Sequence, residues 1–153
     1  MIKNEFETLR PAVLGFLAAG LFFMLFSRFF FLSCVPTESM SPTLKKGAVV
    51  LILRTDEIRR GDIIAFHKDG EVYIKRVIGI SEDTVKIDNG RLTVNGEELK
   101  EDYAEEKAGD ENFFCVVPEN ACVVMGDNRK NSIDSRSWEQ PFVPLADVIG
   151  RAI

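Results

Sequence analysis

The order of apolar and polar positions divides the chain into an apolar N-terminal segment and a longer part made of short alternating segments. From Pro11 to Phe26 every residue is apolar or glycine, and after Ser27 and Arg28 the apolar run resumes as far as Leu32. About 20 such residues span a bilayer as a helix that rises ~1.5 Å per residue. The pattern therefore predicts a transmembrane anchor over residues 11–32, with the long side chain of Arg28 reaching water at the far interface.

A cleavable signal peptide is the alternative interpretation of this segment. Its apolar core would normally be ~7–15 residues long and would end in small residues of the A-x-A kind. Here the run is longer and ends in bulky side chains, Phe29 to Leu32. We therefore expect an uncleaved anchor between a short cytoplasmic tail, residues 1–10, and an extracytoplasmic domain, residues 33–153.

The orientation of this anchor is only weakly marked by charge. Arg10 stands immediately before the span and favours a cytoplasmic N-terminus, because positive residues accumulate on the cytoplasmic side. Arg28, Lys45 and Lys46 follow the span and nearly balance that preference. The expected location is the cell membrane, with a single span and the domain outside.

The rest of the chain is predicted to be all-β. Apolar or alternating runs recur at close intervals between turn signals, which is typical of β domains. The pairs Asn89-Gly90 and Asn95-Gly96 are the preferred residues of tight hairpins and predict a meander. An acidic segment over 102–112 is expected to be an exposed loop. The predicted strands cover residues 48–53, 63–66, 71–80, 84–88, 91–94, 113–117, 121–125 and 142–149.

Composition narrows the functional classes. A net charge of −5 without a basic patch argues against nucleic-acid binding. The three cysteines are an odd number, so they do not all pair within one chain. A hairpin between Cys115 and Cys122 would place the two sulfurs opposite each other, but we favour free buried thiols over a disulfide. The sequence shows no metal-ligand spacing.

Two residues far apart in the sequence are candidates for catalysis. Ser39 follows the anchor, and a serine hydroxyl needs a base to become a nucleophile. The sole histidine, His67, stands between a predicted strand and a turn, and no G-x-S-x-G motif surrounds the serine. Lys75 lies inside a mostly apolar predicted strand, where burial would lower its pKa and supply a neutral amine. Considered alone, Ser39 could equally be an ordinary turn residue. Lys75 alone could equally be a solvated lysine on an edge strand.

Four motifs that follow one another along the chain favour the catalytic interpretation of Ser39 and Lys75. Together, behind the anchor, they resemble the bacterial type I signal peptidases of peptidase family S26, which use a Ser-Lys dyad. The resemblance covers residues 35–152. The motifs are Ser39-Met40-Ser41-Pro42-Thr43-Leu44, then Gly61 to Phe66, then Tyr73 to Gly79, and finally Gly126 to Arg129 with Asn131-Ser132 and Asp134 to Arg136.

This resemblance implies a fold and a set of roles. The fold would be the signal-peptidase β fold, which is related to that of LexA-like self-cleaving repressors. Ser39 would be the nucleophile and Lys75 the general base. The backbone N–H of Ser39 and the hydroxyl of Thr37 would bind the oxyanion, and Ser132 would orient the base lysine.

The resemblance also implies supporting residues and a substrate class. Ion pairs would stabilise the site through Arg76, Asp127, Asp134 and Arg136. Residues next to the dyad in sequence, namely Met40, Leu44 and Ile74, are candidate walls of the substrate pocket. The expected function is a membrane-anchored serine endopeptidase that removes signal peptides with A-x-A sites from secretory preproteins. It would work among membrane lipids without a cofactor.

Three other functions remain as alternatives. A self-cleaving repressor would need a helix-turn-helix and an Ala-Gly cleavage site where this chain has an apolar span. A non-catalytic relative that assembles surface polymers such as pili would typically lack one member of the dyad. A membrane-anchored β domain that binds a partner through Phe113, Phe114 and the acidic segment would not depend on the dyad.

Overall fold

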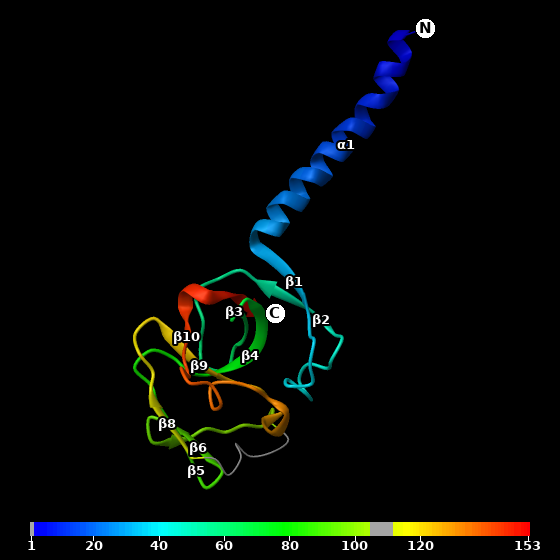
Figure 1. Ribbon diagram of the computed structural model, residues 1–153. Helices are drawn as coiled ribbons and strands as arrows, with labels where there is room; N and C mark the ends of the chain where they lie inside the picture. The colour runs from blue at the N-terminus through cyan, green and yellow to red at the C-terminus, as the bar shows by residue number, and fades with distance from the viewer. Residues whose placement is uncertain (1, 105–111) are drawn as a thin grey trace.

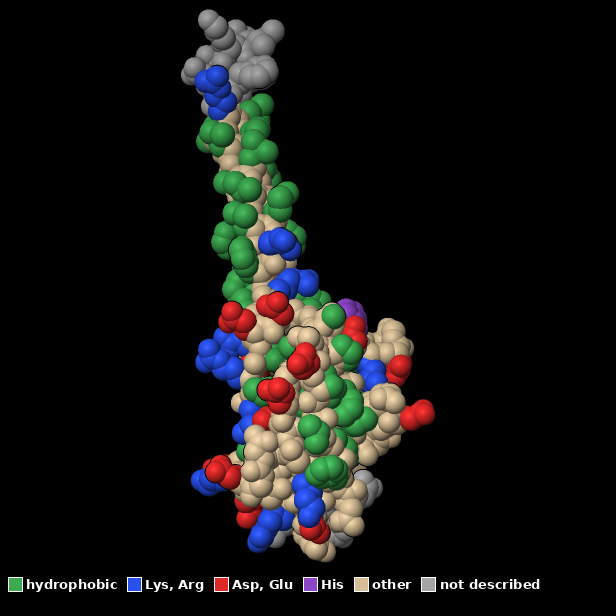
Figure 2. Space-filling view, turned by 90° about the vertical axis from the view of Figure 1, so that its left-hand side faces the viewer, with side chains coloured by type: hydrophobic (Ala, Val, Ile, Leu, Met, Phe, Trp, Pro, Cys, Tyr) green, Lys and Arg blue, Asp and Glu red, His purple; other side chains and the backbone are tan. Residues whose placement is uncertain are grey.

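The apolar N-terminal segment forms one long helix that extends away from a β domain (Figure 1). The computed structural model describes residues 2–104 and 112–153, and α1 covers Ile2–Phe29. Its most apolar stretch, Leu9–Phe29, is 21 residues long and none of it is buried. At ~1.5 Å per residue, that length matches a hydrocarbon core of ~30 Å. The helix is therefore long and apolar enough to cross a membrane, and apolar side chains cover it in Figure 2.

The helix ends before the predicted limit of the span at Leu32. Phe30–Cys34 form strand β1, which pairs antiparallel with β2, Val49–Leu53. Phe31 packs against a core cluster of the domain. The last apolar residues of the predicted span thus belong to the β domain, because an apolar run alone does not distinguish a lipid-facing helix from a strand.

The described residues of the domain form two antiparallel sheets, and the predicted all-β class is confirmed. The large sheet has the order β1-β2-β11-β3-β4-β9-β10, and the small sheet has the order β7-β6-β5-β8. In the large sheet, β3 is Ile63–Lys68, β4 Glu71–Gly79, β9 Ala121–Met125, β10 Val143–Pro144 and β11 Val148–Ala152. In the small sheet, β5 is Thr84–Asp88, β6 Arg91–Val94, β7 Glu97–Glu98 and β8 Phe113–Val116.

The predicted meander is confirmed in the small sheet. β5 pairs with β6 and β6 with β7, each pair joined by one Asn-Gly turn. All four turn residues have positive φ: 51° at Asn89, 74° at Gly90, 55° at Asn95 and 82° at Gly96. Asparagine and glycine tolerate this left-handed backbone, so the local sequence sets the register of the hairpins. Of the predicted acidic loop over 102–112, residues 105–111 lie outside the described part of the chain.

The single strand predicted over residues 142–149 is wrong. Two strands take its place, separated by a 3₁₀ turn over Leu145–Asp147. Pro144 has no N–H to continue a ladder, which favours this interruption. After the turn, β11 crosses to the middle of the large sheet and lies between β2 and β3.

Cys115 and Cys122 do not face each other across a hairpin. Cys115 lies in β8, which pairs with β5 of the small sheet, and Cys122 lies in β9, which pairs with β4 of the large sheet. Cys115 and Cys122 are free and buried, as predicted, and Cys34 is free and exposed. Burial raises the pKa of the Cys115 thiol to about 11 and that of the Cys122 thiol to about 12.

In the described part of the chain, the buried apolar residues form three clusters that support the two sheets. One lies against the small sheet around Ile87 and Val123, and the other two lie against the large sheet around Ile52 and Phe66. Met40, which follows the candidate nucleophile, is completely buried in one of these clusters. The loop that carries Ser39 is therefore anchored directly to the core.

Candidate active site

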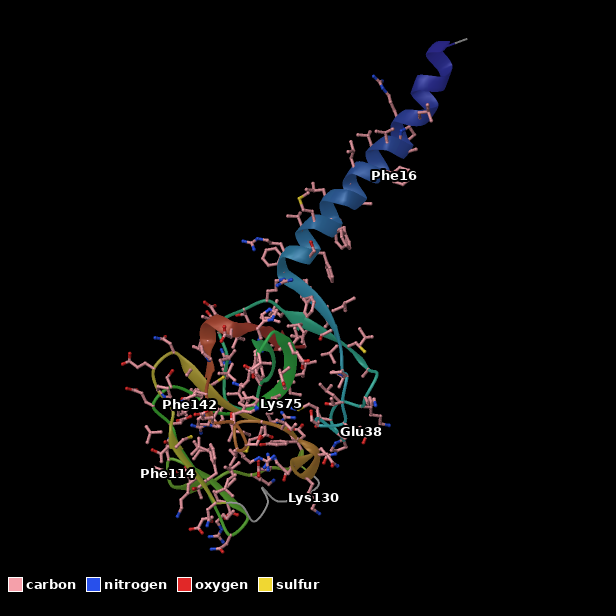
Figure 3. The ribbon with its side chains drawn as sticks, viewed as in Figure 1. Phe16, Glu38, Lys75, Phe114, Lys130 and Phe142 are labelled. Carbon is pink, nitrogen blue, oxygen red and sulfur yellow. The ribbon has the colours of Figure 1, made fainter. Side chains whose placement is uncertain are left out.

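Ser39 and Lys75 meet inside the domain although 36 positions separate them in the sequence. The Lys75 Nζ lies 2.5 Å from the Ser39 Oγ, within hydrogen-bond distance. Both residues are buried, with exposed fractions of 4% for Lys75 and 5% for Ser39. Figure 3 shows Lys75 on β4, with Glu38, the neighbour of Ser39, on the loop to its right. The structure thus brings the two predicted catalytic residues into direct contact.

Strand alternation orients the lysine. Lys75 pairs with Ile64 of β3, and because side chains alternate along a strand, Arg76 points to the other face. Two contacts fix the serine opposite it. The backbone N–H of Asn128 donates to the Ser39 carbonyl at 3.0 Å, and the buried Met40 side chain holds the next residue. The two halves of the pair therefore come from a strand and from a loop held by the polar segment that follows β9.

Burial makes Lys75 a weaker base but a more available one. Desolvation is the main cause that lowers the pKa of Lys75 from 10.5 to about 8. The negative charge of Asp134 opposes this shift, the positive charge of Arg136 adds to it, and Asp127 opposes it. A pKa near 8 leaves a useful fraction of neutral amine at neutral pH, as a general base requires.

The Thr37 side chain lies beside the nucleophile. Its hydroxyl donates to the Ser39 Oγ at 3.0 Å, and the backbone N–H of Ser39 donates to the Thr37 Oγ1 at 3.4 Å. The Ser39 Oγ therefore accepts a bond from Thr37, which leaves its own proton free to point at the lysine nitrogen. Both predicted oxyanion donors stand next to the atom that would attack a carbonyl.

Ser132 is close to the nucleophile, but its hydrogen-bond partner is missing among the described residues. Its Oγ is buried and the predicted bond to Lys75 is not present. The hydroxyl instead helps to lower the pKa of Asp134, although it makes no hydrogen bond of good geometry with that carboxylate. A Cβ on Gly126 would lie 2.3 Å from the Ser132 Oγ and 2.4 Å from the Ser39 carbonyl oxygen. Both atoms therefore occupy the space that a side chain at position 126 would need, so only glycine fits there.

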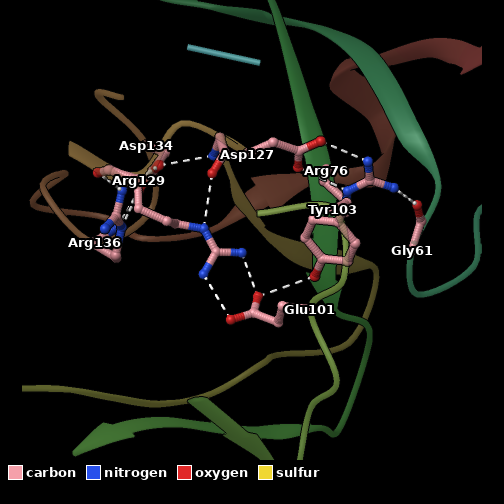
Figure 4. A network of polar contacts seen from close by, with 9 residues as sticks. Gly61, Arg76, Glu101, Tyr103, Asp127, Arg129, Asp134 and Arg136 are labelled. Atoms are coloured by element: carbon pink, nitrogen blue, oxygen red, sulfur yellow. Dashed lines mark hydrogen bonds and ion pairs between the residues drawn. The ribbon is translucent and has the colours of Figure 1, made fainter. Parts of the chain in front are cut away.

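A network of paired charges acts on Lys75, and Figure 4 shows its ion pairs. Arg76 donates to both carboxylate oxygens of Asp127, at 2.8 and 2.6 Å, and Arg136 donates to both of Asp134, at 2.8 and 2.9 Å. The Asp127 and Asp134 carboxylates are fully buried. Burial alone would raise the pKa of Asp134, and the bonds and charge of Arg136 outweigh it, so the pKa is lowered. All four predicted ion-pair residues thus form two pairs.

A third pair was not predicted. Arg129 forms a bidentate ion pair with Glu101, which the sequence analysis assigned to no site. The acidic segment predicted over 102–112 begins just after Glu101 and indicated only an exposed loop. The only feature of the sequence that could have indicated this pair is Arg129 itself. It directly follows an apolar predicted strand, and if its side chain is buried there it requires a carboxylate partner.

A cleft of about 240 Å³ opens beside the dyad. Met40 and Ile74 are among its lining residues, whereas Leu44 packs in a core cluster and does not line it. Val72 and Ile133 add exposed apolar surface to the rim. A larger hollow of about 860 Å³ lies over the small sheet, and none of the predicted catalytic residues lines it. Among the described residues, no cluster of three histidine, cysteine or acidic side chains is placed to hold a metal ion.

A buried serine and lysine in contact, carried by a β domain behind an apolar helix, have the geometry that a serine–lysine hydrolase would need. The sequence profile of the family described as "Signal peptidase, peptidase S26" matches residues 8–153. The chain therefore belongs to this family, and the resemblance predicted from the four motifs is confirmed.

Several members of this family are similar to the chain over most of its length. Signal peptidase I of Leptolyngbya laminosa is 37% identical over 133 residues, which cover 78% of this chain and 64% of that protein. Signal peptidase I S of Bacillus subtilis (strain 168) is 38% identical over 118 residues, which cover 67% and 64%. Thylakoidal processing peptidase 1 of Arabidopsis thaliana is 30% identical over 136 residues, which cover 78% and 39%. The chain thus spans less than two thirds of each of these relatives.

A solved structure supports the same assignment. The crystal structure of a signal peptidase I from Enterococcus faecalis V583 superposes with a TM-score of 0.55 at 34% identity. It covers 62% of this chain and 96% of that one. The β domain of this chain therefore has the fold of a signal peptidase I.

Proposed function

We propose that this protein is a membrane-anchored serine endopeptidase that removes N-terminal signal peptides from secretory preproteins. The observation that carries the proposal is the contact between the Lys75 Nζ and the Ser39 Oγ in a buried site. Membership of the signal peptidase family and relatives named signal peptidase I support the substrate class. The apolar helix supports attachment to the membrane.

The proposed reaction is an acyl transfer through the serine hydroxyl. Neutral Lys75 takes the Ser39 proton while the Oγ attacks the scissile carbonyl carbon. The resulting ammonium returns that proton to the leaving amine, and the C–N bond breaks to leave an ester on Ser39. Water then attacks the ester with Lys75 again as base, which releases the carboxylate and restores the hydroxyl. Lys75 thus transfers the protons, Ser39 forms the bond to the acyl group, and the reaction needs no cofactor.

The oxyanion of this reaction would be bound by donors that are already in place. In the free protein the Ser39 N–H is only weakly bonded, at 3.4 Å, and the Thr37 hydroxyl is within reach of the attacking oxygen. When the carbonyl carbon becomes tetrahedral, both groups turn to its negative oxygen. Ser132, whose buried hydroxyl has no partner among the described residues, would bond and orient the lysine.

Specificity and location follow from the cleft and the helix. Met40 and Ile74 would form shallow apolar walls that accept small side chains before the cut, as in A-x-A sites. The proposed anchor has its N-terminus in the cytoplasm and holds the domain on the extracytoplasmic face. Anchoring both enzyme and signal peptide in one bilayer raises their effective concentration.

Cleavage of a secretory preprotein with an A-x-A site by the full chain in liposomes tests this proposal. Wild type, Ser39→Ala and Lys75→Ala would be compared by gel shift and by sequencing the new N-terminus. Cleavage after A-x-A by wild type alone supports both the activity and the dyad. Cleavage that survives Ser39→Ala would refute the assigned nucleophile. A folded wild type that cuts no preprotein would favour the non-catalytic assembly role.

A further inference from the structure

A short segment after β7, residues 101–104, contacts β4, which carries Lys75, and the polar segment after β9, which holds the Ser39 carbonyl. Glu101 holds Arg129 through two hydrogen bonds, one of them at 3.0 Å from the Arg129 Nη1 to the Glu101 Oε2. The Arg129 side chain is 1% exposed and that of Glu101 is 13% exposed. An arginine so deeply buried requires its carboxylate, because an unpaired buried charge is strongly unfavourable.

Tyr103 of the same segment makes the second contact. Its hydroxyl donates to the Glu101 Oε1 at 3.0 Å, and the Arg76 guanidinium lies over its ring, 4.0 Å from the centroid. This distance is well within the range of cation–π attraction. Arg76 directly follows Lys75 in β4 and also holds Asp127, so the tyrosine ring supports the strand that carries the base.

The contacts continue from Arg129 to the nucleophile. The Arg129 Nε donates to the Gly126 carbonyl at 2.9 Å. Gly126 packs against the Ser39 carbonyl, and the N–H of Asn128 bonds the same carbonyl at 3.0 Å. A shift of Arg129 would therefore move the turn against which Ser39 rests.

Electrostatics keep this network in one protonation state. Burial would lower the pKa of Arg129, and the hydrogen bonds and charge of Glu101 outweigh that effect and raise it. Burial, followed by the charge of Glu101, raises the pKa of Tyr103 well above its ordinary value. The phenol therefore remains a donor over the whole pH range in which Lys75 loses its proton.

We propose that Glu101 and Tyr103 are positioning residues that set the separation of Ser39 and Lys75 by linking Arg129 on one side to Arg76 on the other. Neither residue touches the reacting atoms. The proposal rests on the peptidase activity proposed above. It assigns a function to the segment that leaves the small sheet: this segment couples that sheet to the active-site geometry.

The test separates positioning from stability with a double variant. Glu101→Met/Arg129→Met replaces a buried ion pair by apolar side chains of similar volume, a change that often preserves stability. Tyr103→Leu removes the ring beneath Arg76 together with the hydroxyl that donates to Glu101. The matched control is Asp102→Asn, which alters the exposed Lys100–Asp102 pair of the same segment. Each full-length protein in detergent is assayed for kcat, KM and unfolding midpoint.

We expect the double variant and Tyr103→Leu to lose at least about tenfold in kcat, with KM within about twofold of wild type, because small misplacements of reacting groups are costly. Asp102→Asn should match wild type. Wild-type kcat in either folded variant would overturn the proposal. A kcat loss that Asp102→Asn shares would overturn it as well.

A second readout keeps this result separate from the choice of substrate. The rate at which a small serine-directed acylating reagent modifies Ser39, followed by intact mass, needs no preprotein. Slower acylation in the two variants supports positioning even if wild type cuts no preprotein, an outcome that would reject only the proposed function. Equal acylation rates in wild type and in both folded variants would reject the positioning role.

Discussion

Replacing the buried base should make the protein more stable while it abolishes activity. Lys75 is 4% exposed and has a pKa of about 8, against 10.5 for an ordinary lysine. Below pH 8 the lysine is charged in both the folded and the unfolded chain, so the folded state bears the whole cost of burying the ammonium. Lys75→Met keeps the length of the side chain and removes the charge.

The magnitude follows from the size of the pKa shift. A difference of 2.5 units between 10.5 and about 8 corresponds to roughly 3 kcal/mol, because one unit is about 1.4 kcal/mol. The lost hydrogen bond to Ser39 offsets about 1 kcal/mol of this. At pH 7 the variant should therefore exceed wild type by roughly 2 kcal/mol in free energy of unfolding.

The sign of the pH dependence distinguishes this reasoning from simple repacking. Between pH 8 and 10.5 the folded chain has lost the lysine proton while the unfolded chain still binds it. Wild-type stability therefore rises with pH in this window relative to the variant. The advantage of Lys75→Met should be full at pH 7 and largely gone at pH 10.

Urea unfolding in detergent, followed by fluorescence, measures this difference. The single tryptophan, Trp138, packs against Phe66 and Tyr73 of the large sheet and so reports on that sheet. Lys45→Met, at an exposed position, is the matched control and should change stability little at either pH. A Lys75→Met variant that is less stable than wild type at pH 7, or whose advantage does not change with pH, would refute the reasoning.

Three further predictions concern the same site. The kcat/KM of wild type should rise with pH and level off above an apparent pKa of about 8, as Lys75 loses its proton; a flat profile from pH 6 to 9 would contradict a lysine base. Gly126→Ala would place a Cβ 2.4 Å from the Ser39 carbonyl oxygen and should lower kcat by about 100-fold. Gly79→Ala is the matched control: its Cβ would clash with Val85 in the core, so it should lower the unfolding midpoint with far less effect on kcat. A Gly126→Ala variant with wild-type kcat would show that the turn at Gly126 does not position Ser39. Thr37→Val should lower kcat by about 100-fold with little change in KM, whereas Thr37→Ser should keep most activity; equal losses in both would exclude a role for the hydroxyl.

The sequence by itself determined the features that depend on neighbouring residues. The apolar run gave the long helix, and the Asn-Gly pairs gave the tight turns at Asn89 and Asn95. Strand alternation placed Lys75 and Arg76 on opposite faces before any partner was known. Periodicity and turn preference are local properties of the backbone, so they can be read from short stretches of sequence.

The tertiary structure alone decided which distant residues meet. Strand β11 enters the large sheet between β2 and β3, and the two strands that carry Cys115 and Cys122 belong to different sheets. Nothing in the sequence identified Glu101, 28 positions away, as the partner of Arg129. Such choices depend on which groups lose water together when the sheets close, and residue spacing does not encode this. The same desolvation, which acts on Lys75 only in the folded chain, lowers its pKa.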